Sequence, residues 1–353
     1  MKFYVIIWDF NIGGVQKHAT ALANFLVQKN NRVVILYGTK EGSLLESLDS
    51  RVELRQLSIR NTNNPFAFLK IYRRLKKEID QNSVVLANGP NNFRQISRVN
   101  FLIGNWKLLY ILHNDIGIKS SRLRWFKVFE MKTLLNAKRT KVIALSERQR
   151  KRHIETLEVR EIEVVPNFID FNHNHLRKAN REHPRGISIG RYSIEKGYDV
   201  LLEAVGATSS NVCIDVFGFG EDGRQKLISD ASIQGTGRLN FFDARLNILE
   251  LLSQYDYYVC PSRRESFGIS IIEALSCGLP VVTTDCDGPV EVIDHSNGII
   301  VARENSKALA DGIEEMHEAI REGKYQPEEL RENVAQYSIE RVMNKYVDLL
   351  KLD

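Results

Sequence analysis

Long apolar runs are missing from this sequence. No stretch of its 353 residues approaches the roughly 18 consecutive apolar residues that a membrane-spanning helix needs. The first residues, MKFYVIIWDFNIGG, also lack the basic start, the long apolar stretch and the small-residue cleavage site of a signal peptide. The sequence therefore predicts neither a membrane span nor a secretory leader.

Cysteine is scarce as well, with four residues in the whole chain: Cys213, Cys260, Cys277 and Cys286. None of them forms a C-x-x-C pair, and histidine and cysteine never cluster at the spacing of metal ligands. This pattern argues against a disulfide framework and a zinc site. It is typical of reduced thiols in the core of a cytosolic protein.

Several familiar catalytic and binding patterns are also absent. No G-x-S-x-G turn and no Ser–His–Asp or Cys–His set occurs, so the sequence offers no nucleophile of the hydrolase kind. No helix-turn-helix and no aromatic RNA platform occurs either, and we expect no nucleic-acid partner.

What the chain does contain is a repeating order of strands and helices. Hydrophobic residues make up 43% of the 353 residues, enough for a large core, and the length favours two domains. Short β-branched runs such as KFYVIIW, RVVILY, SVVLA, KLLYIL and KVIAL are each followed by a helix-length segment. The order restarts with GISIG, NVCIDVF, YDYYVC and LPVVTT. Parallel sheets covered on both faces have this pattern, so the sequence predicts an α/β fold of two doubly wound, Rossmann-like domains.

The composition also suggests the domain boundaries. A polar segment without a clear period begins after Pro166. We interpret residues 167–184 as the linker between an N-terminal domain, residues 1–166, and a C-terminal domain, residues 185–335. Apolar residues recur at helical spacing near the end of the chain, at Val342, Tyr346, Leu349 and Leu350. We therefore expect residues 336–353 to form a terminal helix that packs back on the N-terminal domain.

Charge is divided unevenly between the two halves. Residues 1–180 carry 31 Lys and Arg against 15 Asp and Glu, a net charge of +16, and residues 181–353 carry 18 against 29, a net charge of −11. The segment Lys119–Lys141 mixes eight cations with aromatic and aliphatic residues, among them Trp125, Phe126, Phe129 and Leu134. A basic amphipathic segment favours an anionic membrane surface, although an ordinary surface helix with a core stripe also explains it. We expect a cytoplasmic protein that is peripheral on the inner face of the cell membrane.

Three turns between a strand and a helix carry residues suited to ligand binding or catalysis. Gly13 and Gly14 open a helix after the first strand, where glycines let a ligand approach the backbone; a tight turn also explains them. Arg191 and Lys196 lie on the loop in GRYSIEKGYDVLLEAV, and two cations beside free amides suit a diphosphate, unless they form a solvated basic loop. His113 ends a strand, a place that favours function, although a lone histidine is more often structural.

A fourth segment, VFGFGEDG, spells G-x-G-x-x-G after a strand, at Gly218, Gly220 and Gly223. Asp243 follows twenty residues later, as the ribose-binding acid of a dinucleotide site does. Two acids between the glycines would repel a pyrophosphate, and the motif follows the second strand of its domain instead of the first. NAD binding is therefore an alternative and not the main prediction.

The triplet DCD contains Asp285 and Asp287, and paired acids can hold a metal on a diphosphate. Gly288 and Pro289 follow directly and favour a polar turn. We expect no metal ion at this place.

The stretch RRESFGISIIEALSCGLPVV contains Glu265 and, eight residues later, Glu273 inside an apolar run. A carboxylate there is costly unless it has a partner. We expect a helix over Ser266–Ser276 that ends at Gly278, which directs both acids toward one ligand. The alternative is a capping box, in which Ser270 starts the helix and satisfies Glu273 locally.

Together these segments resemble the retaining glycosyltransferases of the large GT-B group known as family 4. The shared segments are IGGVQKH, LHND, ALSE, VVPNFID, GRYSIEKG, FGFGED, PSRRESFGISIIEALSCGLPVV and DGPVEVI, and they extend over nearly the whole chain in the family's order. The resemblance implies two Rossmann-like domains facing a central cleft. It also implies a nucleotide-diphosphate sugar as donor, held mainly by the C-terminal domain.

The resemblance further implies roles for individual residues. Arg191 and Lys196 would neutralise the diphosphate, and Glu273 would accept hydrogen bonds from the ribose hydroxyls. Glu265 and His113 would lie at the transferred sugar. The remaining donor-side positions that the resemblance implies are Gly13, Gly14, Gly218, Phe267, Gly268, Ile269 and Glu291.

The residues and the resemblance predict a retaining hexosyltransferase. It would move a hexose or N-acetylhexosamine from a nucleotide-diphosphate sugar, with UDP favoured over GDP, to a glycan acceptor carried on a lipid, as in surface polysaccharide or lipopolysaccharide synthesis. The nucleotide sugar is a substrate, and we expect no cofactor. Two alternatives stay open: a sugar-nucleotide epimerase on the same fold, and an NAD-dependent oxidoreductase that uses the loop Gly218–Gly223.

Overall fold

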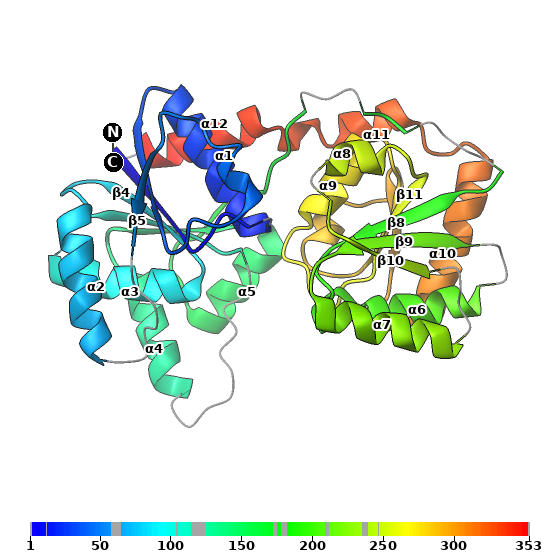
Figure 1. Cartoon of the computed structure of the whole chain (residues 1–353), viewed down its shortest axis with the longest axis horizontal. Coiled ribbons are helices and arrows are strands. Elements are labelled where there is room, and N and C mark those ends of the chain that lie inside the picture. The colour runs from blue at the N-terminus through cyan, green and yellow to red at the C-terminus, as the bar shows by residue number, and fades with distance from the viewer. Residues whose placement is uncertain are drawn as a thin grey trace. The chain divides into compact units, whose positions relative to one another are not determined.

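A computed structural model of the chain describes residues 2–11, 13–57, 65–103, 105–113, 124–171, 175–177, 182–208, 212–234, 239–245 and 247–351. The chain divides into two compact units (Figure 1). One comprises Met1–Pro166 with Lys345–Asp353, and the other comprises Asn167–Asn344. Each unit contains one sheet of parallel strands packed against helices, so the predicted α/β class is confirmed.

The sheet of the N-terminal unit has the strand order β3-β2-β1-β4-β5-β6-β7. Its strands are β1 (Lys2–Ile7), β2 (Arg32–Tyr37), β3 (Glu53–Gln56), β4 (Val84–Asn88), β5 (Lys107–Ile111), β6 (Thr140–Ala144) and β7 (Glu163–Val164). Its helices are α1 (Gly14–Gln28), α2 (Pro65–Glu78), α3 (Pro90–Ile103), α4 (Arg124–Leu135) and α5 (Glu147–Leu157). The last turns of α12 (Ile339–Lys351) also belong to this unit.

The core of this unit explains why its central strands are continuous apolar runs. Alternate residues of β1, such as Tyr4 and Ile6, join α2, α3 and α4 in one buried cluster. Within it Phe93 stacks on Tyr110, with ring centroids 4.2 Å apart. The residues of β1 that alternate with Tyr4 and Ile6 are buried as well, on the face where α1 packs on β1 and β2. Because both faces of the sheet are covered, its central strands are apolar throughout.

The sheet of the C-terminal unit has the order β10-β9-β8-β11-β12-β13. Its strands are β8 (Arg185–Ile189), β9 (Cys213–Gly218), β10 (Leu239–Asp243), β11 (Tyr257–Cys260), β12 (Val281–Thr284) and β13 (Gly298–Val301). Its helices are α6 (Tyr198–Ala207), α7 (Glu221–Gln234), α8 (Ile248–Leu252), α9 (Ile269–Ser276), α10 (Ser306–Arg321) and α11 (Pro327–Asn333).

Both sheets change direction at one point. In the N-terminal sheet the chain runs from β1 to β2 and β3 on one side, then from β4 outward on the other side. In the C-terminal sheet the corresponding neighbours are β8 and β11. Loops that leave two neighbouring strands in opposite directions frame a crevice at the carboxyl ends, where ligands of such folds bind.

The sequence pattern missed the edge strands β3, β7, β10 and β13. These strands are short, and β3, with the sequence ELRQ, is polar. An edge strand pairs on one side only and is less covered, so it does not need the apolar run that marks a central strand. The four cysteines are free, and all but Cys213 are buried, as expected.

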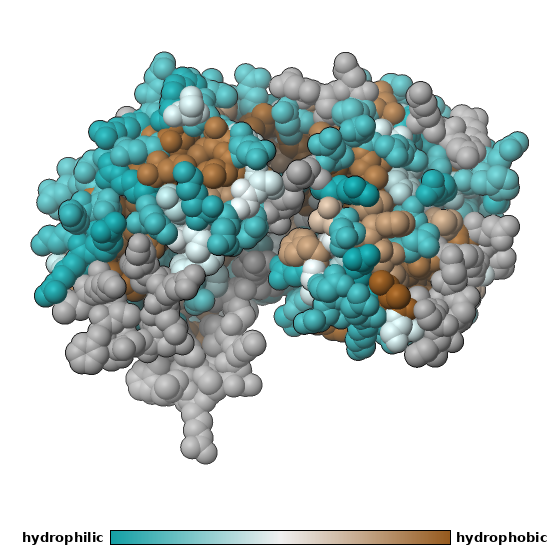
Figure 2. All heavy atoms as spheres, viewed as in Figure 1, coloured by the Kyte–Doolittle hydropathy of each residue, from teal (hydrophilic) through white to brown (hydrophobic). Residues whose placement is uncertain are grey.

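Hydrophilic residues cover much of the described surface on the face that Figure 2 shows, with smaller apolar areas between them. The exposed large hydrophobic side chains in the described part of the chain are Trp8, Phe101, Leu102, Phe129, Ile194, Phe219, Ile228, Phe242 and Ile300. No described helix combines the length and the hydropathy that crossing a bilayer requires.

Candidate functional site

The loops at the direction change of the C-terminal sheet hold most of the predicted donor residues. The short turn Ile194–Lys196 follows β8, and the loop from Pro261 to Gly268 follows β11. The two loops touch, since the Arg263 amide donates to the Glu195 carbonyl at 2.8 Å. Gly197 has φ 67°, and a Cβ there would lie 2.1 Å from the carbonyl oxygen of Pro261, so only glycine allows this approach.

An ion pair joins Lys196 to Glu265 across these loops. Lys196 Nζ donates to Glu265 Oε2 at 2.6 Å, and the two side chains are only 24% and 17% exposed. Burial disfavours the charged lysine, but the charge and the hydrogen bond of Glu265 act together with smaller contributions from nearby groups, and the pKa of Lys196 is raised above its ordinary value. The structure thus brings together two predicted residues that are 69 positions apart.

A residue that the sequence pattern did not single out holds this arrangement. The Arg263 guanidinium donates to both carboxylate oxygens of Asp199, at 2.7 and 2.8 Å, and also to the Ile194 carbonyl at 2.8 Å. These hydrogen bonds to Asp199 raise the pKa of Arg263 and lower that of Asp199. Arg263 therefore ties the Glu265 loop to the start of α6 and the Lys196 turn. The only sequence signal was its place beside Glu265 in RRES.

The helix that carries Glu273 begins later than predicted. The expected start at Ser266 is wrong, because Gly268 adopts φ 89° and caps α9 at Ile269. The capping-box alternative is also wrong: α9 begins before Ser270, and Ser270 Oγ accepts from the Tyr258 hydroxyl at 2.8 Å. Glu273 lies in the second turn of the helix and is half-buried.

The remaining donor-side positions surround the start of α9. Phe267 is buried and packs edge-on against Tyr337, with ring centroids 5.4 Å apart, so its side chain anchors the loop before α9. The Gly288 amide donates to the Glu265 carbonyl at 3.1 Å. This contact brings the turn Pro289–Glu291, with Glu291 exposed at its end, to the same loop.

Packing explains two glycines of the G-x-G-x-x-G segment, Gly218 and Gly223. A Cβ at Gly218 would lie 2.0 Å from the Gly190 carbonyl oxygen, and one at Gly223 would lie 2.1 Å from that of Tyr192. The segment follows β9, away from the direction change at β8 and β11. Asp243, the predicted ribose acid of an NAD site, pairs with Arg224 at 2.8 Å. The geometry therefore disfavours the NAD alternative.

The acids of the D-x-D triplet have protein partners. Asp285 accepts from the Arg303 side chain at 2.9 Å and from its backbone amide at 3.1 Å. Asp287 also has a partner within the chain. Among the described residues no group of three or more His, Cys, Asp or Glu has the arrangement of a metal site.

Arg191 is the exposed member of the predicted cation pair. It lies on the loop after β8, and its guanidinium carbon is 5.9 Å from the centre of the exposed Phe219 ring. Weakly held and solvent-facing, this side chain is available to an anionic ligand, whereas Lys196 is fixed by Glu265.

In the N-terminal unit, His113 is placed by Asn88 and His18. The Asn88 amide donates to the Ile6 carbonyl at 3.4 Å, which turns its oxygen toward His113 Nε2, 3.2 Å away. The His18 ring lies 5.0 Å from the His113 ring, and His18 Nε2 is 3.0 Å from the hydroxyl of Tyr346 on α12. Burial lowers the pKa of His113 to about 4, so the imidazole is neutral at pH 7.

Gly13 and Gly14 lie where the sequence predicted, at the start of α1. Gly13 caps the helix in an extended conformation, and its carbonyl accepts the first helical hydrogen bond, from Lys17 at 2.8 Å. The first turn of α1 carries no acidic residue, so its free amides suit an anion or a hydroxyl-rich ligand.

The basic segment Lys119–Lys141 is described only in part. Residues 114–123 lie outside the described residues, as do the side chains of Trp125 and Phe126. Of the predicted apolar stripe, Leu134 is buried and Phe129 is 67% exposed.

Two family models match the chain in succession. The model described as Glycosyltransferase Family 4 matches residues 12–173, and the one described as Glycosyl transferases group 1 matches residues 173–341. Together they extend over both units.

Two curated relatives are similar over parts of their length. The chain is 37% identical to N,N'-diacetylbacillosaminyl-diphospho-undecaprenol alpha-1,3-N-acetylgalactosaminyltransferase of Campylobacter jejuni in an alignment of 94 residues. This alignment covers 26% of this chain and 25% of that protein. It is 25% identical to GDP-mannose:cellobiosyl-diphosphopolyprenol alpha-mannosyltransferase of Xanthomonas campestris in an alignment of 240 residues, which covers 65% of this chain and 63% of that protein. The match thus spans less than two thirds of either relative.

A solved structure supports the fold over the full length. Anabaena HepE, in complex with UDP and glucose, superposes with a TM-score of 0.82 at 18% identity, covering 100% of both chains. The predicted GT-B fold is therefore confirmed. The N-terminal half of the present chain matches the family 4 model, and its C-terminal half matches the group 1 model. The chain therefore belongs to this family of GT-B glycosyltransferases.

Proposed function

We propose that the protein is a retaining glycosyltransferase that moves a hexose or N-acetylhexosamine from a nucleotide-diphosphate sugar to a lipid-linked glycan acceptor. Among donors we favour UDP sugars over GDP sugars. Relatives are named for transfer to diphospho-undecaprenol-linked and diphosphopolyprenol-linked sugars, which supports this class of acceptor and a role in surface polysaccharide synthesis. Their partial coverage makes the acceptor a proposal for this chain.

The observation that carries the proposal is the Lys196–Glu265 pair at the direction change between β8 and β11. A half-buried ion pair is costly to build unless its charges are used or well compensated. Here one charge is a cation at the place where ligands of such sheets bind, and the other is a carboxylate beside the start of α9. A diphosphate with an attached sugar presents a matching anion and matching hydroxyls.

The residues then divide the chemistry as follows. Arg191 and Lys196 stabilise the negative charge that grows on the leaving diphosphate, the main contribution to rate in such a site. Glu273 accepts from the ribose diol, since a carboxylate can receive two adjacent hydroxyls. Glu265 accepts from hydroxyls of the transferred sugar, and neutral His113 also lies near this sugar. The leaving phosphate assists deprotonation of the acceptor hydroxyl, so that substitution occurs on one face without an enzyme nucleophile.

We also propose that the reaction needs no metal ion and no cofactor. The two cations at the diphosphate provide the positive charge for which other nucleotide-sugar sites use a metal. Asp285 is held by Arg303, which leaves this carboxylate less available for coordination.

For location, we propose peripheral binding to the inner face of the cell membrane through the basic half of the chain. Phe101 and Leu102, at the end of α3, and Phe129, on α4, expose 79%, 61% and 67% of their surfaces. Exposed apolar side chains on a domain with an excess of cations suit an anionic bilayer surface. Flotation with anionic liposomes at low salt tests this: the protein should float, and recovery in the soluble fraction would contradict the membrane part only.

A nucleotide panel tests the main proposal. UDP should raise the melting temperature of the protein more than GDP or ADP does, and NAD should have no effect. Stabilisation by NAD alone would overturn the proposal. Nucleotide release from the nucleotide sugar should require an acceptor. If the protein instead releases nucleotide or converts the sugar when no acceptor is present, an epimerase is indicated. The anomeric coupling constant of the product in proton NMR reports retention or inversion.

A further inference from the structure

A pocket of about 370 Å³ lies at the carboxyl edge of the N-terminal sheet. It is lined by the ends of β1, β2 and β4, by Leu57 after β3 and by the first turns of α3. This is the direction change between β1 and β4, where ligands of doubly wound sheets bind. The volume falls within the range of about 300–1,000 Å³ that is usual for small-molecule sites.

One wall of the pocket is the indole of Trp8, which is 46% exposed although it is one of the largest apolar side chains. The backbone fixes its position: the Trp8 carbonyl accepts from the amides of Gly38 and Thr39, at 3.0 and 2.8 Å. The ring lies so close to Gly38 that a Cβ there would be 2.6 Å from the indole. A large aromatic ring held open to solvent in a concave site is suited to stack on a ligand.

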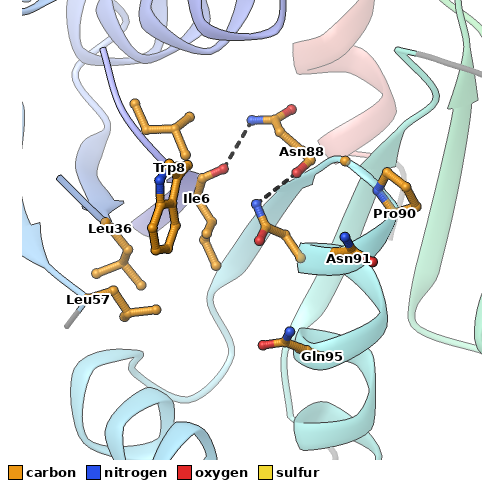
Figure 3. A pocket seen from close by; sticks show the side chains of 12 residues that line it. Ile6, Trp8, Leu36, Leu57, Asn88, Pro90, Asn91 and Gln95 are labelled. Atoms are coloured by element: carbon orange, nitrogen blue, oxygen red, sulfur yellow. Dashed lines mark hydrogen bonds between the residues drawn. The ribbon is translucent and has the colours of Figure 1, made fainter. Parts of the chain in front are cut away.

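The opposite wall consists of amides. Figure 3 shows Trp8 on one side of the pocket and Asn88, Pro90, Asn91 and Gln95 on the other. The Asn91 and Gln95 side chains make no hydrogen bond to any residue that the structure describes, so their donors and acceptors are available. None of the described lining residues carries a charge. An anionic ligand would lose its hydration there without gaining a counter-charge.

The pocket is connected to the candidate reaction residue through Asn88. This side chain lines the pocket and accepts from His113 Nε2 at 3.2 Å. Its backbone carbonyl accepts from the Asn92 side chain at 2.9 Å, which fixes the first turn of α3 to the end of β4. A ligand in the pocket therefore lies one side chain away from His113.

We infer that this pocket binds an uncharged pyranose ring of the acceptor glycan. The C–H groups on one face of a sugar ring meet the electron-rich face of the indole, while its hydroxyls exchange hydrogen bonds with the amides of Asn91 and Gln95. The inference rests on the proposed transferase function and extends it: the acceptor sugar is neutral, and Trp8 selects for a ring with a C–H face.

Saturation-transfer NMR with soluble probes tests this inference without the donor. The probes are methyl β-D-glucopyranoside, methyl N-acetyl-β-D-glucosaminide and, as the charged counterpart, methyl β-D-glucuronide. We expect saturation at the ring protons of at least one neutral glycoside and about tenfold weaker binding of the glucuronide. Trp8→Ala should weaken binding of the neutral probe about tenfold, and Trp8→Phe should restore most of it. Gln95→Met, which keeps an unbranched side chain of similar length but removes the amide, should weaken it about fivefold.

The matched control is Phe242→Ala, which removes another exposed aromatic ring, on β10 in the C-terminal unit, and should leave the glycoside signal unchanged. Equal saturation in wild type and Trp8→Ala, or no saturation of any neutral glycoside, overturns the inference. Loss of folding is excluded if UDP still raises the melting temperature of Trp8→Ala. Failure of UDP to stabilise the wild-type protein counts against the proposed function instead, so the two failures are distinguishable.

Discussion

Replacing Lys196 by methionine tests the centre of the candidate donor site. The substitution keeps the length and apolar stem of the side chain but removes its charge. Glu265 then loses a donor 2.6 Å away while its side chain stays only 17% exposed. The enzyme should therefore lose the cation that stabilises the leaving diphosphate, and the loop should lose part of its stability.

The two effects have different sizes. A hydrogen bond to a charged group contributes about 1.5–3 kcal/mol to the free energy of unfolding. In a unit of this size, each kcal/mol lost lowers the melting temperature by roughly 2–4 °C. Loss of one preorganised group at a developing charge typically costs about 2.7–4 kcal/mol, or 10²–10³-fold in kcat. The loss of transition-state stabilisation, measured from kcat, should therefore exceed the loss in the free energy of unfolding.

Three measurements separate these effects: nucleotide release with a glycan acceptor, thermal unfolding, and nucleotide binding. Lys196→Arg should recover part of kcat, because it restores a cation. Lys226→Met serves as the control, since Lys226 is exposed on α7 and distant in sequence from the site loops. A Lys196→Met protein with lower stability but wild-type kcat would refute the reasoning, because the lysine would then only hold the loop.

Further predictions concern packing, a buried hydroxyl and pH. Gly197→Ala should lower the free energy of unfolding by more than Gly89→Ala, as measured by chemical denaturation: both residues have positive φ, but a Cβ at position 197 meets a carbonyl oxygen at 2.1 Å and one at position 89 meets nothing within 4 Å. Equal losses would contradict the close approach. Tyr346→Phe should cost about 1–3 kcal/mol in the same assay, because it removes the hydroxyl 3.0 Å from buried His18 Nε2; an unchanged midpoint would show that this contact is weak. Burial lowers the pKa of His317 to about 4. The unfolded chain therefore takes up a proton below about pH 6.5 that the folded state takes up only near pH 4, and stability falls as the pH falls through this window. His317→Gln should reduce that loss in thermal unfolding at pH 7 and pH 5, and an identical pH response would exclude the histidine as its source.

The sequence identified the central strands and the loops of the candidate site because these features are local. A strand buried on both faces must be apolar, and the loop after it must carry the polar residues. The sequence pattern therefore predicted β8 and the loop with Arg191 and Lys196 that follows it. The start of α9 was misplaced because the conformation of one glycine decided it, and the φ of 89° at Gly268 is not written in any periodic pattern. The edge strands escaped detection because partial burial does not demand an apolar run.

By itself, then, the sequence determined the fold class and the order of the site motifs along the chain, since periodicity and composition report the burial of each short segment. Only the tertiary structure decided which motifs meet. It paired Lys196 with Glu265 across 69 positions, clamped Arg263 on Asp199 across 64, and joined His18 to Tyr346 across 328. It also assembled Trp8 and the amides of α3 into one pocket. The physical reason is that strand order, which no single segment encodes, sets which carboxyl ends are neighbours.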